Sequence, residues 1–204
     1  MRIVILFRLI TAFLLLKGNL LTAQISQKQN FTTPFLVECS YDEFNIVKHN
    51  NKMGIANKSS KIIFLKFDEI PCDESLQTKS MIRARLKKKW GYINSKGKIV
   101  IPFRYDATSG FSEDLENPAV VIIENKYGYI DKTGKTVIPV IYDAAAEFQD
   151  GFATVLYHKK WGMIDTKGEI IVPFIYDKIG PYFTNGKIEV TLDNKLFFID
   201  KPQH

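Results

Sequence analysis

Residues 89–106 read Lys-Trp-Gly-Tyr-Ile-Asn-Ser-Lys-Gly-Lys-Ile-Val-Ile-Pro-Phe-Arg-Tyr-Asp. Most of this pattern returns at residues 126–143, which begin Lys-Tyr-Gly-Tyr-Ile-Asp. It returns again at residues 160–177, which begin Lys-Trp-Gly-Met-Ile-Asp. The chain is therefore a tandem array. Its copies begin 37 and then 34 residues apart, and periods of about 20–50 residues are typical of stacked or ring-like repeat folds.

Weaker copies extend the array toward both ends of the chain. Residues 52–68 form a degraded copy with Met53 in the tryptophan position, and residues 195–200 form a half copy in which Phe197 replaces the glycine. The repeats are 34 to 37 residues long, as measured between successive glycines: Gly54, Gly91, Gly128 and Gly162. We expect about four and a half units over residues 34–201, after a flexible lead-in at 24–33 and before a short tail at 202–204.

Each unit is expected to consist of β-strands joined by tight turns. The β-branched run Ile99–Ile101 is typical of a strand, and Asn94 to Gly97 has the pattern of a type I turn whose glycine adopts a left-handed conformation. The prolines that follow the second strand are expected to end it, because proline cannot continue a hydrogen-bonded ladder. These prolines are Pro102, Pro139 and Pro173.

The recurring Lys-Trp-Gly-Tyr-Ile-Asp-x-x-Gly-Lys, followed by Val-Ile-Pro and Tyr-Asp, resembles the WG (KWG) repeat family of bacterial proteins. The resemblance covers nearly all of residues 34–201. It implies an all-β fold of repeated hairpins and supplies no catalytic residues. We favour an open stacked array over a closed, propeller-like ring.

Residues 1–23 have the features of a secretory signal peptide. Arg2 and Arg8 precede the apolar run Leu9–Leu16, and Ala23 offers a small residue at a cleavage site. The apolar run is too short for a membrane-spanning helix, which needs about 20 residues, so no transmembrane span is expected in the mature chain. Export would place the protein in the periplasm, on the outer surface or in the medium.

Charge and cysteine content limit the function classes. Removal of residues 1–23 takes away Arg2, Arg8 and Lys17, so the net charge falls from +6 to +3. That charge is too small to indicate a nucleic-acid partner. Cys39 and Cys72 could form one disulfide in an exported chain, and two separate buried thiols are the alternative.

Two recurring columns of residues could be taken for sites. The aromatic column (Trp90, Tyr127, Trp161) is expected to pack, with a stripe of binding platforms as the alternative. The aspartate column is expected to hold turns through backbone N–H groups rather than to bind calcium, which needs six to eight oxygens. That column comprises Asp42, Asp68, Asp106, Asp143 and Asp177.

Residues outside the repeat pattern give no catalytic or metal site. The histidines His49, His158 and His204 do not have zinc-site spacing with the cysteines. The acids Glu113, Asp114 and Glu116 are expected to be solvated on a loop. The basic run of Arg83, Arg85 and Lys87 to Lys89 is expected to be the solvated face of a strand, although an anionic surface could bind it.

These observations predict an exported, non-catalytic repeat protein without a cofactor that binds or scaffolds a protein or glycan partner. Two alternatives remain: a structural envelope component without a discrete ligand, and an enzyme with an unrecognised site. The residues that do not repeat are the ones expected to distinguish this protein from similar arrays.

Overall fold

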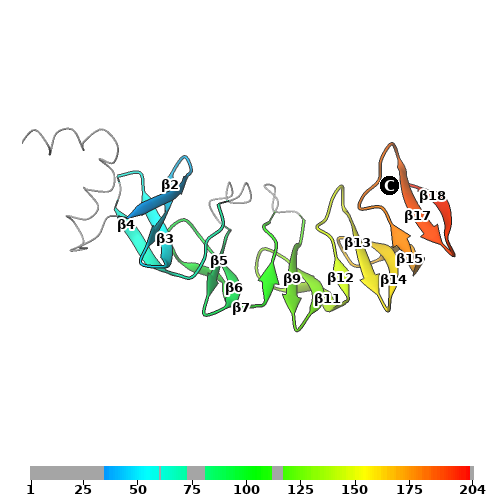
Figure 1. Ribbon diagram of the computed structural model, residues 1–204, viewed down its shortest axis with the longest axis horizontal. Coiled ribbons are helices and arrows are strands. Elements are labelled where there is room, and N and C mark those ends of the chain that lie inside the picture. The colour runs from blue at the N-terminus through cyan, green and yellow to red at the C-terminus, as the bar shows by residue number, and fades with distance from the viewer. Residues whose placement is uncertain (1–34, 60, 73–80, 112–116, 203–204) are drawn as a thin grey trace, which may run out of the picture. The chain divides into compact units, whose positions relative to one another are not determined.

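The computed structural model describes residues 35–59, 61–72, 81–111 and 117–202. The chain divides into two compact units, residues 1–72 and 73–204. The described residues form antiparallel sheets without any helix, and none of them could therefore cross a membrane as a helix (Figure 1). The expected all-β repeat fold is confirmed, and the preference for an open array stays a prediction.

The first unit contains one four-stranded sheet with the strand order β1-β2-β3-β4. Its strands are β1 (Leu36–Ser40), β2 (Phe44–His49), β3 (Lys52–Asn57) and β4 (Ile62–Phe67). Phe35, Val47, Ala56 and Ile62 form a buried apolar cluster on this sheet. The degraded copy of the repeat forms β3 and β4 of this sheet.

The second unit contains four sheets, two of three strands and two of four. The first two sheets comprise β5 (Ile82–Leu86), β6 (Lys89–Ile93) and β7 (Ile99–Tyr105), then β8 (Ala107–Thr108), β9 (Ala119–Ile123), β10 (Lys126–Ile130) and β11 (Thr136–Tyr142). The other two comprise β12 (Ala144–Ala145), β13 (Phe152–Tyr157), β14 (Lys160–Asp165) and β15 (Ile170–Tyr176), then β16 (Lys178–Ile179), β17 (Lys187–Leu192) and β18 (Lys195–Asp200).

Each sheet crosses a boundary of the sequence repeat. The strand that carries Trp-Gly or its replacement is named here the Trp-Gly strand, and these strands are β3, β6, β10, β14 and β18. It pairs on one side with the strand that precedes it and, except in β18, on the other side with the strand that follows it. The following strand is named the proline strand in β7, β11 and β15, and β4 takes the same place in the first unit.

The hairpin between a Trp-Gly strand and its proline strand has the turn that the sequence predicts. Gly97 has φ 78° and donates its N–H to the carbonyl of Asn94 at 2.8 Å. The side chain of Asn94 accepts hydrogen bonds from the N–H groups of Lys96 and Lys98, both at 3.0 Å. Asp131 and Asp165 make the same contacts in the next two units. Ser60, at the equivalent position of the degraded copy, lies outside the described residues.

The expectation that proline ends the second strand is wrong. Pro102 lies in the middle of β7, and Pro139 and Pro173 lie in the middle of β11 and β15. The ladder shifts register beside each proline, so that Trp90 pairs with Tyr105 while Tyr92 pairs with Ile101. The proline strand bulges there and lies at the edge of its sheet, so the missing N–H removes no ladder hydrogen bond.

The placement of Tyr41-Asp42 in the aspartate column is also wrong. Asp106 follows a proline strand, whereas Asp42 lies in the turn between β1 and β2. The N–H of Tyr41 donates to the carbonyl of Phe44 at 2.9 Å, as the N–H of Gln149 donates to the carbonyl of Phe152 at 2.8 Å. A Tyr-Asp pair can thus occur by chance at another turn of the unit, which the sequence alone does not distinguish.

Successive sheets of the second unit bury residues between them. Tyr129 and Ile138 of one sheet share a buried cluster with Ala153, Val155 and Ile164 of the next. Phe152, Met163 and Val172 then share a cluster with Ile188 and Val190 of the last sheet. A sheet that lies between two others therefore has an apolar face on each side. Each of these faces is buried by contact with one neighbouring sheet.

Candidate binding surface

The aromatic column of the Trp-Gly strands packs against the cores. Trp90 and Tyr127 are half-buried against the clusters around Tyr92 and Tyr129. The guanidinium groups of Arg83 and Arg85 lie 5.8 and 5.7 Å from the ring centre of Trp90. The ring of Trp90 is therefore flanked by two cationic side chains, and the half-buried rings pack against the cores instead of forming open platforms.

The fully buried aromatic residues of the Trp-Gly strands are two positions further along, where the sequence suggested no special role. Tyr92 and Tyr129 are fully buried. The hydroxyl of Tyr129 donates to the carbonyl of Ala146 at 2.8 Å, and that of Tyr92 donates to the carbonyl of Ser109 at 2.7 Å and also contacts the Thr108 hydroxyl. Burial raises the pKa of both phenols above its usual value. The recurrence of Tyr-Ile after the glycine was the signal that could have found them.

The aspartate column joins each repeat to the next, as turn-holding residues do. Asp106 accepts a hydrogen bond from the Lys89 ammonium at 2.5 Å and another, on its second carboxyl oxygen, from the N–H of Glu124 at 2.8 Å. Asp177 makes the same pair of contacts, with Lys160 at 2.6 Å and the N–H of Asp193 at 2.9 Å. The expected role in holding turns is confirmed for these members.

These carboxyl groups stabilise turns whose backbone adopts an unfavourable left-handed conformation. Glu124 and Asn125 lie in a two-residue hairpin turn with φ of 50° and 61°, a left-handed conformation that favours glycine. Bonds to lysine ammonium groups, and then to backbone N–H groups, lower the pKa of the column carboxyls below the usual aspartate value. The carboxyls with this lowered pKa are those of Asp106, Asp143 and Asp177.

The basic run before Trp90 is dispersed by the fold. Arg83 and Arg85 are half-buried beside Trp90, Lys89 is paired with Asp106, and Lys87 and Lys88 form a turn with positive φ. Arg83 and Arg85 are thus partly covered and not fully solvated as expected, and Lys89 is engaged by a carboxylate. The arrangement supports the structural interpretation of the run over an anion-binding one.

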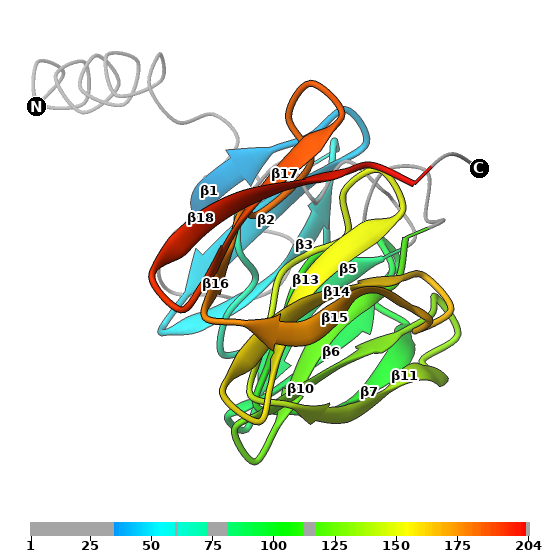
Figure 2. The ribbon, with the colours of Figure 1, turned by 90° about the vertical axis from the view of Figure 1, so that its right-hand side faces the viewer.

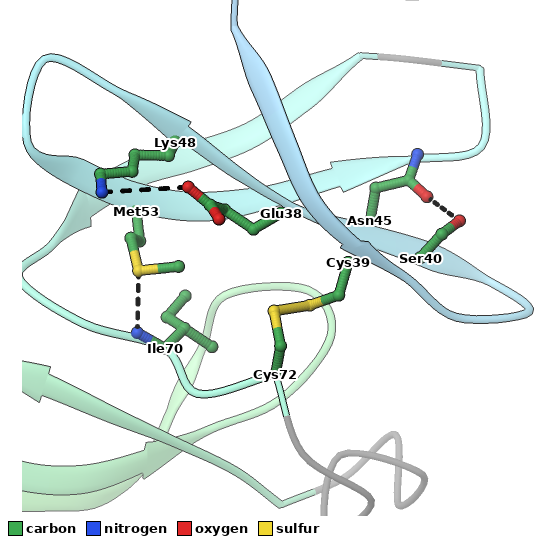
Figure 3. Close-up of a disulfide and its surroundings, with 8 residues drawn as sticks. All are labelled: Glu38, Cys39, Ser40, Asn45, Lys48, Met53, Ile70 and Cys72. Carbon is green, nitrogen blue, oxygen red and sulfur yellow. Dashed lines mark hydrogen bonds and ion pairs between the residues drawn. A yellow bond between two sulfur atoms is a disulfide. The ribbon is translucent and has the colours of Figure 1, made fainter.

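The cysteines are joined to each other in the first unit. Cys39 of β1 and Cys72, which follows β4, form a disulfide with a Cα–Cα distance of 6.0 Å (Figure 3). Nearby, the N–H of Ile70 lies 3.3 Å from the sulfur of Met53. The bond ties the segment after β4 back to β1 at the opposite edge of the sheet.

The remaining candidates do not come together. Glu113, Asp114 and Glu116 lie outside the described residues, as do His204 and residues 1–33. His158 is exposed in the turn between β13 and β14, and His49 ends β2 beside the ring of Phe35. Within the described ranges no three His, Cys, Asp or Glu side chains are grouped closely enough to hold a metal ion.

The last sheet exposes three consecutive large apolar residues of β18. At the β18 positions equivalent to Trp161, Gly162 and Met163 stand Leu196, Phe197 and Phe198, which are 55%, 45% and 59% exposed. Figure 2 shows β16, β17 and β18 adjacent, with β18 at the edge of the sheet. Met163, by contrast, is buried between two sheets.

A hollow of about 530 Å³ opens on the outer face of this sheet. Tyr182 and Phe198 provide its aromatic walls, and Tyr182 is 48% exposed. Its polar groups include Lys187, which is paired with Asp200 at 2.5 Å, and Glu189. Apolar walls with a few polar groups are typical of binding sites of this size. We name the hollow together with Leu196 and Phe198 the outer face.

Sequence reasoning did not identify the outer face. Tyr182 stands where Glu147 stands in the previous unit, and Lys187 where the buried Phe152 stands. Both are departures from the repeat, the kind of position at which function was expected. They were not recognised because the last copy is weak and its strand pairing is visible only in the structure.

Comparison with known proteins agrees with this architecture. The family model described as WG containing repeat matches residues 90–126, 127–161 and 161–195, just over half of the chain. No curated protein matches the chain. A solved structure described as a crystal structure of the eukaryotic initiation factor is similar at 11% identity with a TM-score of 0.51. The match covers 82% of this chain and 52% of that one, so the chain spans about half of its length, and the likeness shows the fold alone.

Proposed function

Because the chain belongs to the family of WG-containing repeat proteins, we propose that it is a non-catalytic binding and scaffolding module for a partner protein. The partner packs on the outer face, where the apolar side chains of the last sheet are exposed. The recurring residues build the units, and the non-repeating residues at the last sheet provide the specificity.

One observation carries this proposal. Tyr92, Tyr129 and Met163 occupy the same position in three successive units, and each is buried against residues of the following sheet. Phe198 occupies that position in the last sheet and is 59% exposed. Repeat arrays usually end on a polar face, whereas contiguous exposed apolar surface marks interaction sites.

The mixed apolar and polar composition of the outer face favours binding of a partner protein over a purely structural role. Tyr182 and Phe198 are the residue types that dominate protein interfaces, and Glu189 and the Lys187–Asp200 pair supply polar groups beside them. The same aromatic and polar groups could also bind a glycan, so the test below separates the two ligand classes.

Export is part of the proposal. Residues 1–23 have the composition of a cleavable signal peptide, and a disulfide between Cys39 and Cys72 fits an oxidising compartment. Intact mass measurement of the protein from its native cells should give a chain that begins near Gln24. A chain that retains Met1 or residues 2–23 would contradict export with cleavage.

The binding function is tested by capture from envelope extracts of the source cells. Wild-type chain and the Phe198→Lys and Ile141→Lys variants are immobilised in parallel. Ile141 is 44% exposed on β11 and serves as the matched control. We expect wild type and Ile141→Lys to retain the same protein, and Phe198→Lys to retain at least about tenfold less.

Two results would overturn this account of the function. Equal capture by all three chains would show that binding does not use the outer face. Capture that survives protease treatment of the extract but is lost after glycan digestion would assign a glycan instead of a protein.

A further inference from the structure

The last Trp-Gly strand has one open edge. Within the described residues, β3, β6, β10 and β14 each have a paired strand on both sides, whereas β18 pairs only with β17. An unpaired edge presents backbone N–H and C=O groups that can pair with another strand. This edge is distinct from the outer face, because it lies in the plane of the sheet.

The register identifies which backbone groups point outward. Leu192 and Lys195 flank a two-residue turn with positive φ at Asp193 and Asn194, so they form a hydrogen-bonded pair. The alternate residues Phe197 and Ile199 then also direct their backbone groups to β17. Leu196, Phe198 and Asp200 direct theirs to the open edge, as Trp161 and Met163 do toward β15.

A proline strand does not fit this edge. In β14 the proline strand arches over Gly162, where an added Cβ would lie 2.6 Å from the carbonyl oxygen of Val172. In β18 the equivalent residue is Phe197, so an arching strand would meet a side chain at that position. The edge therefore suits a flat, regular strand that remains in the plane of the sheet.

We propose that this edge pairs with β18 of a second copy of the chain, antiparallel and about a two-fold axis at Phe197. Outward residues must pair with outward residues, and this register places Leu196 opposite Phe198 of the second copy and Phe197 opposite Phe197. Lys201 then lies opposite Asp193 of the second copy. A register centred on Phe198 places Lys195 opposite Lys201, which brings two positive charges together. It also places Leu196 opposite Asp200, where the apolar side chain has no apolar partner.

The strand is self-complementary, which identifies the occupant. Three consecutive exposed apolar residues place side chains on both faces of the sheet, so the partner strand needs apolar residues at three consecutive positions. β18 itself provides them in Leu196, Phe197 and Phe198, and its flanking charges are complementary across the two-fold axis. A two-fold pairing uses the β18 edge of both copies, so this contact closes at a dimer.

The oligomeric state tests this pairing. Sedimentation equilibrium on the mature chain should give twice the monomer mass. Phe197→Lys should raise the dimer dissociation constant at least about tenfold, whereas Ile141→Lys, a residue of similar exposure on β11, should leave it unchanged. A wild-type chain that is monomeric up to about 100 µM, or a dimer insensitive to Phe197→Lys, would overturn the proposal.

Cysteine cross-linking tests the register without depending on the stability of a charged variant. Facing residues of a non-hydrogen-bonded pair lie about 4.5 Å apart at Cα, within the range for a disulfide. Phe197→Cys should oxidise to a covalent dimer, whereas Lys195→Cys should not, because it faces Ile199 of the second copy. Cross-linking at Phe198→Cys in place of Phe197→Cys would contradict the register. Capture by the outer face remains measurable in Phe197→Lys, because Phe197 is not part of that face, so failure of the dimer and failure of the proposed function are distinguishable.

Discussion

The glycine of each Trp-Gly strand is required by close backbone approach. An added Cβ at Gly128 would lie 2.7 Å from the carbonyl oxygen of Pro139 and 2.7 Å from the Cα of Val140. Both are backbone atoms of the arching proline strand, so they cannot rotate away. The glycine and the proline of the repeat are therefore two parts of one feature, a bulged strand crossing over a residue without a side chain.

Gly128→Ala should destabilise the protein by about 1–3 kcal/mol, the usual cost of overpacking a well-packed site. Gly180→Ala is the matched control, because its added Cβ would lie 3.4 Å from the Ile188 side chain, an ordinary contact. Urea denaturation monitored by fluorescence measures both. Equal stability of the two variants would contradict the close approach.

The buried tyrosines make the protein sensitive to alkali. The phenol of Tyr129 is neutral when folded, and burial raises its pKa above the unfolded value of about 10. The stability this provides is present below pH 10 and is lost as the pH rises above it, because only the unfolded chain then releases the proton.

Tyr129→Phe should reduce stability at pH 7 by about 1–2 kcal/mol, since the carbonyl of Ala146 loses its donor. Above pH 10 the variant should release up to about one proton fewer on unfolding, so its free energy of unfolding should fall less steeply with pH. Tyr182→Phe, at an exposed position, should change neither quantity. Thermal denaturation from pH 7 to 11 measures both effects, and an unchanged alkaline slope in Tyr129→Phe would refute this account.

At the scale of the element, the hairpins are joined by charge as well as by packing. Asp143 accepts a hydrogen bond from the Lys126 ammonium at 2.5 Å, and the N–H groups of His158 and Lys159 in the next hairpin also lower its pKa. His158 and Lys159 have φ of 49° and 66°. One carboxyl group thus stabilises a left-handed turn that contains no glycine.

Asp143→Asn should make acid unfolding shallower. The depressed pKa of the carboxyl contributes stability that is present above about pH 4 and is lost as the pH falls through the folded-state value. The variant should be less stable at pH 7 and should take up about one proton fewer on acid unfolding. Glu169→Gln, at an exposed residue just before β15, is the control. Parallel acid profiles of wild type and Asp143→Asn would exclude this role.

The sequence predicted the elements that local chemistry determines. The turn at Asn94 to Gly97 was predicted correctly because its polar residue and glycine act within five residues. The continuation of β7 through Pro102 was missed because it depends on the register against Gly91, a long-range contact. The role of Tyr92 was missed for the same reason, since its hydroxyl bonds to a segment 17 residues away.

At the scale of the whole molecule, the disulfide distinguishes the two compact units. Cys39 and Cys72 are 33 residues apart, and both belong to the first unit. The degraded repeat in that unit has a proline-strand equivalent that is one residue shorter and lacks proline. The covalent link is therefore in the unit that has the weaker copy of the repeat.

Replacing Cys39 and Cys72 by alanine should destabilise the first unit by ~4 kcal/mol, from the loop that the bond closes. Hydrogen–deuterium exchange should show faster exchange in β1 to β4 and unchanged protection in β9 to β15. Equal loss of protection in both units would contradict a local role for the bond.

The outer face could not be predicted from sequence because it is defined by what is not covered. Leu196 and Phe198 look like the apolar positions of any other Trp-Gly strand, and only the structure shows that they are exposed where the equivalent Met163 is buried against the next sheet. Tyr182 and Lys187 belong to one face only through the pairing of β17 with β18. Repetition predicts the fold, and departures from it predict where a partner binds.

Site-specific photo-cross-linking tests the binding account most directly. A photoreactive phenylalanine is placed at Tyr182 on the outer face or at Ile141 on β11, two positions of similar exposure. After irradiation with envelope extract, we predict a covalent adduct with one partner protein from position 182 and none from position 141. Adducts of equal yield at both positions, or an adduct at 141 alone, would contradict the claim that this protein binds its partner through the outer face of the last sheet.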